Sequence, residues 1–182
     1  MTVHPARIAT LANVLGYQAV WFACIAGASR GLVWPGVLAS LLFVSATLWR
    51  GGRWREDLRT VAVALPLGFG MDSLFVAAGW LAYEPAGPWP MAAPVWIAAL
   101  WLSFAMTLNH SLALLRKHVA VAALLGAVGG PLAYWGAASG FGVLSFGPPA
   151  LVASLAVGAA WAVLLPTILV LDSRAAQRTA LA

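Results

Sequence analysis

Two ionisable side chains, Asp72 and His110, lie within stretches of sequence that are otherwise apolar. An acid or an imidazole in hydrocarbon is costly, so each needs a partner or a task. A buried acid can carry a proton or orient the polar end of a ligand, and an imidazole can act as a general acid or base. Asp72 and His110 are therefore the candidate catalytic residues. The alternative is that both only join helices through hydrogen bonds.

Amide and indole groups extend this set of polar residues. Asn109 adjoins His110, and Asn13 and His110 each lie six residues from a basic residue near the end of their apolar stretch. Asn13 and His110 should therefore reach a similar depth, with Gln18 deeper and nearer to Asp72. If the three helices pack together, a hydrogen-bonded track would connect them. The candidate ligand-binding residues are Asn13, Gln18, Trp21, Asp72, Asn109 and His110.

The signals for metal or cofactor binding are weak. His110 has no second His, Cys or carboxylate three or four residues away, and Cys24 is the only cysteine. The chain also lacks a Gly-rich phosphate loop, a nucleophile elbow and an HExxH motif. We therefore predict no metal site and no cofactor, and the sequence leaves open whether the protein is an enzyme.

The elements that must position these residues are six apolar stretches. Hydrophobic residues make up 63% of the chain and charged residues 8%, against roughly 45–50% and 25% in soluble domains. Each stretch has about the 20 residues that a helix needs to cross a bilayer. We predict an all-α polytopic membrane protein, a single domain over 1–182, with six transmembrane helices at about 11–29, 31–49, 60–81, 95–115, 119–139 and 150–171.

The basic residues predict the orientation. With six crossings, nine of the ten Lys and Arg residues fall on one side of the membrane, and only Arg30 falls on the other. Basic flanks are retained in the cytoplasm, so both termini should be cytoplasmic in a bacterial inner membrane. The net charge of +5 is thus explained by topology, and we expect no nucleic-acid partner.

Aromatic, Gly and Pro residues mark the helix ends and possible bends. Segments 84–90 and 140–149 are rich in Pro and Gly and should lie on the outer surface or fold back over the bundle. Gly-Pro clusters at 66–70 and 126–131 should bend or interrupt their helices. Broken helices often mark cavities, but Pro and Gly are also simply commoner in membrane helices than in soluble ones. The aromatic residues near predicted helix ends are interpreted as interface anchors: Trp34, Trp49, Trp54, Trp80, Tyr83, Trp89 and Trp96.

Several short segments resemble a known family. They are Pro94-Val95-Trp96, Leu100-Trp101, Phe104 and Thr107-Leu108-Asn109-His110-Ser111-Leu112, together with Asn13, Gln18, Trp21-Phe22 and Asp72. This pattern resembles an uncharacterised family of small bacterial inner-membrane proteins, a domain of unknown function. The resemblance implies a helical inner-membrane protein of no established activity. It also implies a genomic neighbourhood near cyclopropane-fatty-acid-synthase-like genes, which favours a role with lipids.

Four functions are compatible with these observations. The leading hypothesis is a protein that binds an apolar ligand, a fatty-acyl lipid or an isoprenoid, in a pocket within the bundle. The second is a small lipid-modifying enzyme with His110 or Asp72 as acid or base. A proton-coupled transporter would require a homo-oligomer, and a membrane scaffold would use the basic segment 50–59 to hold soluble partners.

Overall fold

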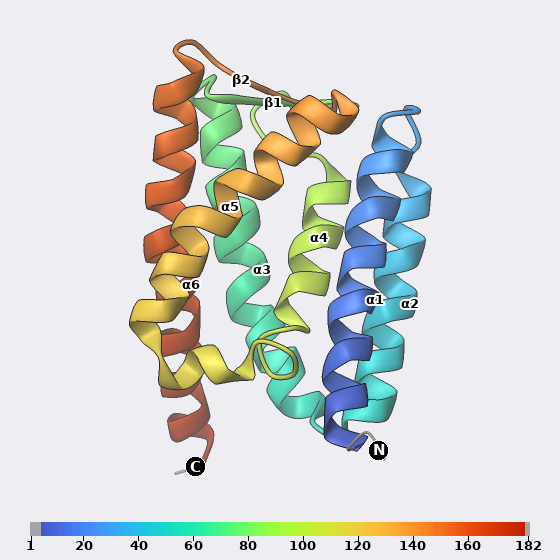
Figure 1. Ribbon diagram of the computed structural model, residues 1–182, viewed down its shortest axis with the longest axis vertical. Helices are drawn as coiled ribbons and strands as arrows, with labels where there is room; N and C mark the ends of the chain where they lie inside the picture. Colours follow the sequence, from blue (N-terminus) through green and yellow to red (C-terminus); the bar gives the residue numbers. More distant parts are fainter. Residues whose placement is uncertain (1–4, 181–182) are drawn as a thin grey trace.

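The computed structural model describes residues 5–180. It shows a bundle of α-helices that is closed at one end by a small sheet (Figure 1). The elements in chain order are α1 (Pro5–Ala28), α2 (Trp34–Gly51), α3 (Trp54–Ala77), β1 (Leu81–Tyr83), α4 (Val95–Ala105), the 3-10 helix η1 (Ala113–Lys117), α5 (Val119–Phe141), β2 (Leu144–Phe146) and α6 (Ala150–Ala180). The predicted all-helical class is confirmed.

Four of the helices are long and apolar enough to cross a membrane: α1, α3, α5 and α6. α2 has 18 residues and is not among these four, and α4 has 11 residues. At 1.5 Å per residue α4 is about 16 Å long, roughly half of a hydrocarbon core. The structure thus supports a membrane-embedded protein, whereas the crossing of all six segments stays a prediction.

The largest difference from the predicted elements is in the fourth segment. The prediction of a single helix over 95–115 is wrong. α4 ends at Ala105, the chain then turns through residues 106–112, and η1 follows. Side chains satisfy backbone carbonyls in the non-helical part, since Asn13 donates to Met106 O and Arg116 donates to Leu108 O. Irregular backbone at membrane depth is tolerated where protein groups replace the lost helical bonds.

Three helices extend well beyond their predicted stretches. α1 begins at Pro5 rather than near residue 11. α3 begins at Trp54 rather than near residue 60, and α6 continues to Ala180 rather than ending near 171. Acidic Glu56 and Asp57 lie in the first turn of α3, where their negative charges interact favourably with the positive end of the helix dipole. Asp57 and Asp172 are both fully buried, so the added turns of α3 and α6 belong to the packed bundle.

One of the two Gly- and Pro-rich segments, 140–149, contributes a strand to a small sheet at one end of the bundle. β1 and β2 pair antiparallel, with Leu81 opposite Phe146 and Tyr83 opposite Leu144. Gly79 after α3 and Gly142 after α5 have φ values of 71° and 66°, which let each helix end sharply before its strand. The strands lie across the end of the bundle opposite to the start of α1 and the end of α6 (Figure 1).

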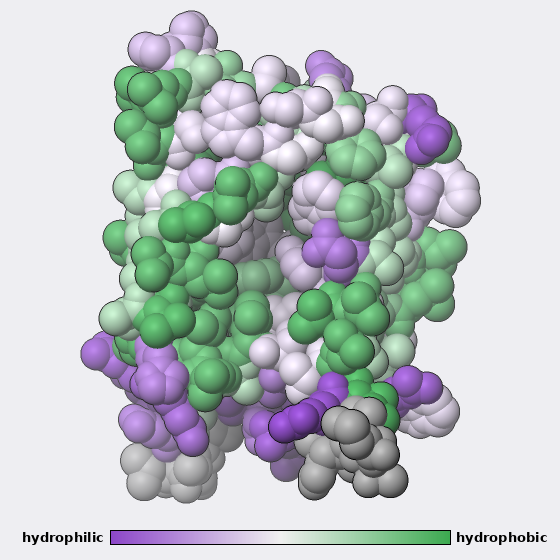
Figure 2. All heavy atoms as spheres, viewed as in Figure 1, coloured by the Kyte–Doolittle hydropathy of each residue, from purple (hydrophilic) through white to green (hydrophobic). Residues whose placement is uncertain are grey.

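Apolar side chains cover the middle of the bundle and charged ones gather at one end. Figure 2 shows hydrophobic residues over the middle of the visible face and hydrophilic ones toward the end where α1 begins and α6 ends. Many large apolar side chains are exposed, such as Leu42 at 64% and Leu155 at 65%. The end of α2, the start of α3 with the connection between them, η1 and the outer turns of α1 and α6 lie at this same end (Figure 1) and carry nine of the ten basic residues.

Proline does not interrupt the long helices. α3 continues through Pro66, α5 through Pro131 and α6 through Pro166. The predicted interruption of the fifth helix at 126–131 is therefore wrong. Its glycines act through their small size, because a Cβ on Gly126 or Gly130 would collide with Trp161 of α6. They let α5 and α6 pack closely, as small residues do between membrane helices.

Candidate ligand cavity

A cavity of about 580 Å³ lies within the bundle. Its lining residues come from α1, α3, α4, α5, α6 and the two strands, and most are apolar or aromatic. Figure 2 shows the molecule hollowed on the face between α5 and α1. Gln18 of α1 and Leu125, Leu132 and Ala133 of α5 line the cavity and are also exposed on the surface of the molecule. The cavity therefore opens sideways, through the apolar surface of the bundle.

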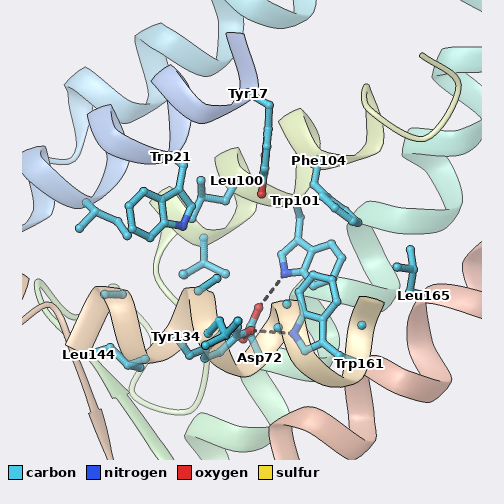
Figure 3. A pocket seen from close by; sticks show the side chains of 18 of the residues that line it. Tyr17, Trp21, Asp72, Leu100, Trp101, Phe104, Tyr134, Leu144, Trp161 and Leu165 are labelled. Carbon is cyan, nitrogen blue, oxygen red and sulfur yellow. Dashed lines mark hydrogen bonds between the residues drawn. The ribbon is translucent and has the colours of Figure 1, made fainter. Parts of the chain in front are cut away.

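Asp72 of α3 is the only acid among the residues that the structure places on the cavity wall. Its side chain is 1% exposed, and three donors surround its two carboxyl oxygens. The Tyr83 hydroxyl donates to Oδ1 at 2.7 Å, the Trp101 indole N–H donates to Oδ2 at 2.6 Å, and the Tyr134 hydroxyl donates to Oδ1. Donors from three other elements, β1, α4 and α5, thus converge on one carboxyl group. Figure 3 labels Trp101 and Tyr134 beside Asp72.

Asp72 lies nearer one end of the bundle than the middle. It is five residues before the end of α3, about 7.5 Å along the helix. The sequence predicts a position for Asp72 close to mid-bilayer or somewhat beyond it. In the structure the acid lies beneath the β1–β2 sheet, and Tyr83 of β1 contacts it from the side of the sheet.

Aromatic rings form much of the cavity wall. Trp101 of α4 and Trp161 of α6 are stacked with ring centroids 4.8 Å apart, and Phe104 meets both edge-on. Trp161 also donates its indole N–H to the Tyr134 hydroxyl at 3.5 Å, which extends the bonded group around Asp72. Tyr17 and Trp21 of α1 face the same space from the opposite side (Figure 3). The wall therefore combines apolar surface with a few fixed hydrogen-bonding groups, as ligand sites do.

Trp96 has an unsatisfied donor beside this cavity. Its side chain is 1% exposed and lines the cavity, and its indole N–H has no hydrogen-bond partner within the described part of the chain. A buried unpaired donor costs about 1–3 kcal/mol, so such a group calls for an explanation.

The interpretation of Trp96 and Tyr83 as interface anchors is wrong, because both are buried and meet edge-on at 5.5 Å.

The glycines of α5 leave room in the cavity. A Cβ on Gly129 would meet only Leu125 Cδ1, at 3.8 Å. Gly126, Gly129 and Gly130 all line the cavity. The Gly-rich cluster therefore does mark a cavity, through missing side chains rather than a broken helix.

His110 lies in a second polar group, separate from the cavity. Its Nε2 is 3.1 Å from each carboxyl oxygen of Asp57, and Asn109 donates to Asp57 Oδ1 and to Thr60 Oγ1, both at 2.9 Å. Arg116 of η1 donates to Asn109 Oδ1. Neither Asn109 nor His110 lines the cavity.

Asp172 of α6 extends this second group. Arg59 Nε donates to Asp172 Oδ1 at 2.8 Å, and Arg116 lies 2.7 Å from Oδ2. Asp172 is fully buried, whereas the two arginines are about one-quarter exposed. The resulting ion network connects α3, η1 and α6 at the basic end of the bundle. Sequence reasoning missed it because these charges were assigned to loops and to the tail.

The structure thus divides the candidate residues between two places. Gln18, Trp21 and Asp72 lie on the cavity wall, and Asn109 and His110 lie in the ion network. Asn13 accepts from the backbone N–H and hydroxyl of Ser111 and holds the turn after α4. The hypothetical track from Asn13 to Asp72 is not formed. No three His, Cys, Asp or Glu side chains gather as metal ligands would over residues 5–180.

Comparison with known proteins identifies the family of the chain. Residues 10–167 match the family described as protein of unknown function (DUF2878), and the chain belongs to it. This match spans every residue of the cavity wall and most of the ion network. No curated protein and no solved structure matches the chain.

Proposed function

We propose that this member of the DUF2878 family is a membrane-embedded protein that holds an apolar chain, fatty-acyl or isoprenoid, in the cavity between α1 and α5. The observation that carries the proposal is the sideways opening. An apolar cavity that opens through an apolar face accepts a molecule directly from the bilayer. Its volume of about 580 Å³ is within the usual range of roughly 300–1,000 Å³ for ligand sites.

Binding from a bilayer differs from binding from water. A lipid chain gains no hydrophobic free energy when it moves from other lipid chains into the cavity. Selectivity must then come from packing against the aromatic wall and from the polar end of the molecule. Asp72, Tyr83 and Tyr134 form the inner polar end of the cavity and would orient that group.

A lipid-modifying enzyme that pairs His110 with Asp72 receives less support. His110 contacts Asp57 in the ion network, whereas Asp72 is enclosed by Tyr83, Trp101 and Tyr134. The two side chains therefore do not share the cavity, and an acid–base pair made of both is not formed. Any chemistry on a bound chain would depend on Asp72.

Filling the cavity tests the proposal. We expect native mass spectrometry of the wild-type protein, extracted in mild non-ionic detergent, to show a retained apolar molecule. Gly129→Phe places a ring in the cavity and should remove this molecule. Gly70→Phe is the matched control: Gly70 lies outside the cavity wall and a Cβ there meets nothing within 4 Å. This variant should retain the molecule.

Two results would contradict the proposal. One is a wild-type protein free of any apolar adduct after extraction from a natural membrane and after incubation with added lipid. The other is an equal loss of the adduct in both phenylalanine variants while both remain folded. Equal loss would indicate lipid bound to the outer surface rather than in the cavity.

A further inference from the structure

We infer that the cavity selects a chain whose polar end is an ammonium group, that is, a cationic amphiphile. This inference depends on the proposed function and specifies the class of ligand. It follows from three features of the wall around Asp72: an acid without a basic partner, one unused acceptor position, and a surround of aromatic rings.

Asp72 differs from the other buried acids in its partners. Asp57 is paired with His110, and Asp172 is paired with two arginines. The cavity wall contains no Arg, Lys or His among the residues that the structure describes. All three partners of Asp72 are neutral donors, so they satisfy hydrogen bonds without supplying a positive charge. Burial without a basic partner disfavours the ionised form of this acid, so a cation that enters the cavity would be the partner that stabilises the carboxylate.

The ionised acid also has one acceptor position that no donor uses among the residues that the structure describes. Two carboxylate oxygens offer about four acceptor positions in total. Tyr83 and Tyr134 occupy Oδ1, whereas the Trp101 indole N–H is the one donor to Oδ2 in the described part of the chain. The open position is therefore on Oδ2, the oxygen beside the aromatic wall. An ammonium N–H placed there would form a charge-assisted hydrogen bond.

Aromatic rings favour the same kind of group. Tyr17, Trp21, Phe104 and the Trp101–Trp161 stack border the cavity (Figure 3). Ring faces attract cations, most strongly where water is excluded. An acid enclosed by aromatic rings is thus suited to an amine. A chain ending in a carboxylate or phosphate would instead place like charges together with no basic side chain to compensate.

Three probes with the same chain and different ends test this inference. They are dodecylammonium, 1-dodecanol and dodecanoate, each titrated into phosphatidylcholine nanodiscs that contain the protein, with empty nanodiscs as the blank. Binding is followed by the intrinsic fluorescence of the cavity tryptophans. For the wild type we expect dodecylammonium to bind at least about tenfold more tightly than dodecanol, and dodecanoate most weakly.

Asp72→Asn isolates the role of the charge. It should reduce the preference for dodecylammonium over dodecanol to within about threefold, and it should leave dodecanol binding nearly unchanged. Glu84→Gln removes the same charge from an exposed residue next to the same end of the bundle, and it should preserve the wild-type preference. If Asp72→Asn fails to fold, the order of the three probes on the wild type carries the test, and dodecylammonium binding no tighter than dodecanol overturns the inference.

The outcomes separate the inference from the proposed function. If no probe binds in the cavity, the proposed function fails and the inference with it. If all three probes bind equally, the cavity holds chains but the inference is wrong. Selective dodecylammonium binding that survives Asp72→Asn also overturns it. A further arm with phosphatidylethanolamine nanodiscs identifies the source: competition indicates a lipid headgroup amine, and its absence indicates a single-chain amine.

Discussion

Gly68 of α3 lies against the indole ring of Trp101 so closely that a Cβ at this position would overlap ring atoms. The glycine thereby fixes the position of the ring whose N–H donates to Asp72. Gly68→Ala should displace Trp101 and cost about 1–3 kcal/mol of unfolding free energy, as overpacking does. Gly70→Ala is the control, because a Cβ there meets nothing within 4 Å and the change should be neutral or stabilising. Equilibrium unfolding in mixed micelles measures both, and equal stability of the two variants would contradict this role.

Single residues also show what the sequence could and could not predict about the site. The cost of an acid in hydrocarbon singled out Asp72. Its partners could not be predicted, because Tyr83, Trp101 and Tyr134 come from three elements whose packing no local pattern specifies. Tyr134 lies on α5, far from Asp72 in the sequence, and its hydroxyl reaches Asp72. Tyr83 and Trp96 were interpreted as anchors because they lie near helix ends, and a fold-back of the outer segments buries both.

Among the elements, α4 differs most from its sequence prediction. The apolar stretch continues past Ala105 without Gly or Pro, so composition predicts a continuous helix. The break is stabilised by distant side chains: Asn13 holds Ser111 from α1, and Asp57 holds Asn109 and His110 from α3. Such contacts have no local signal. The remaining helices were predicted within a few residues, except for the earlier start of α1 and the turns with buried acids that are added to α3 and α6.

The ion network should stabilise this arrangement of elements. Asp172→Asn leaves the two arginines, Arg59 and Arg116, beside a buried amide instead of a carboxylate. We expect a loss of about 3 kcal/mol in unfolding free energy. Glu56→Gln is the matched control, since Glu56 faces Arg53 at 3.9 Å on an exposed surface and should change stability by at most about 0.5 kcal/mol. Similar stability of the two variants would show that the network contributes little.

For the whole molecule, the distribution of charge gives a further prediction. The end of the bundle with nine of the ten basic residues should face the cytoplasm. Cys24 is the only cysteine and is buried, so introduced cysteines can be probed against a low background. With a membrane-impermeant maleimide on intact cells, Ala86→Cys should react at once and Glu56→Cys only after permeabilisation. The reverse order, or equal labelling, would contradict the orientation with both chain ends inside.

The central claim is that an apolar chain occupies the space between α1 and α5. A photoactivatable alkyl chain, incorporated into the membrane and mapped by peptide mass spectrometry, tests it most directly. We predict adducts concentrated in residues 17–25 of α1 and 125–137 of α5, and their loss with excess unlabelled chain. Adducts spread evenly over the exposed apolar surfaces of α2 and α6, at residues such as Leu42 and Leu155, would contradict the account.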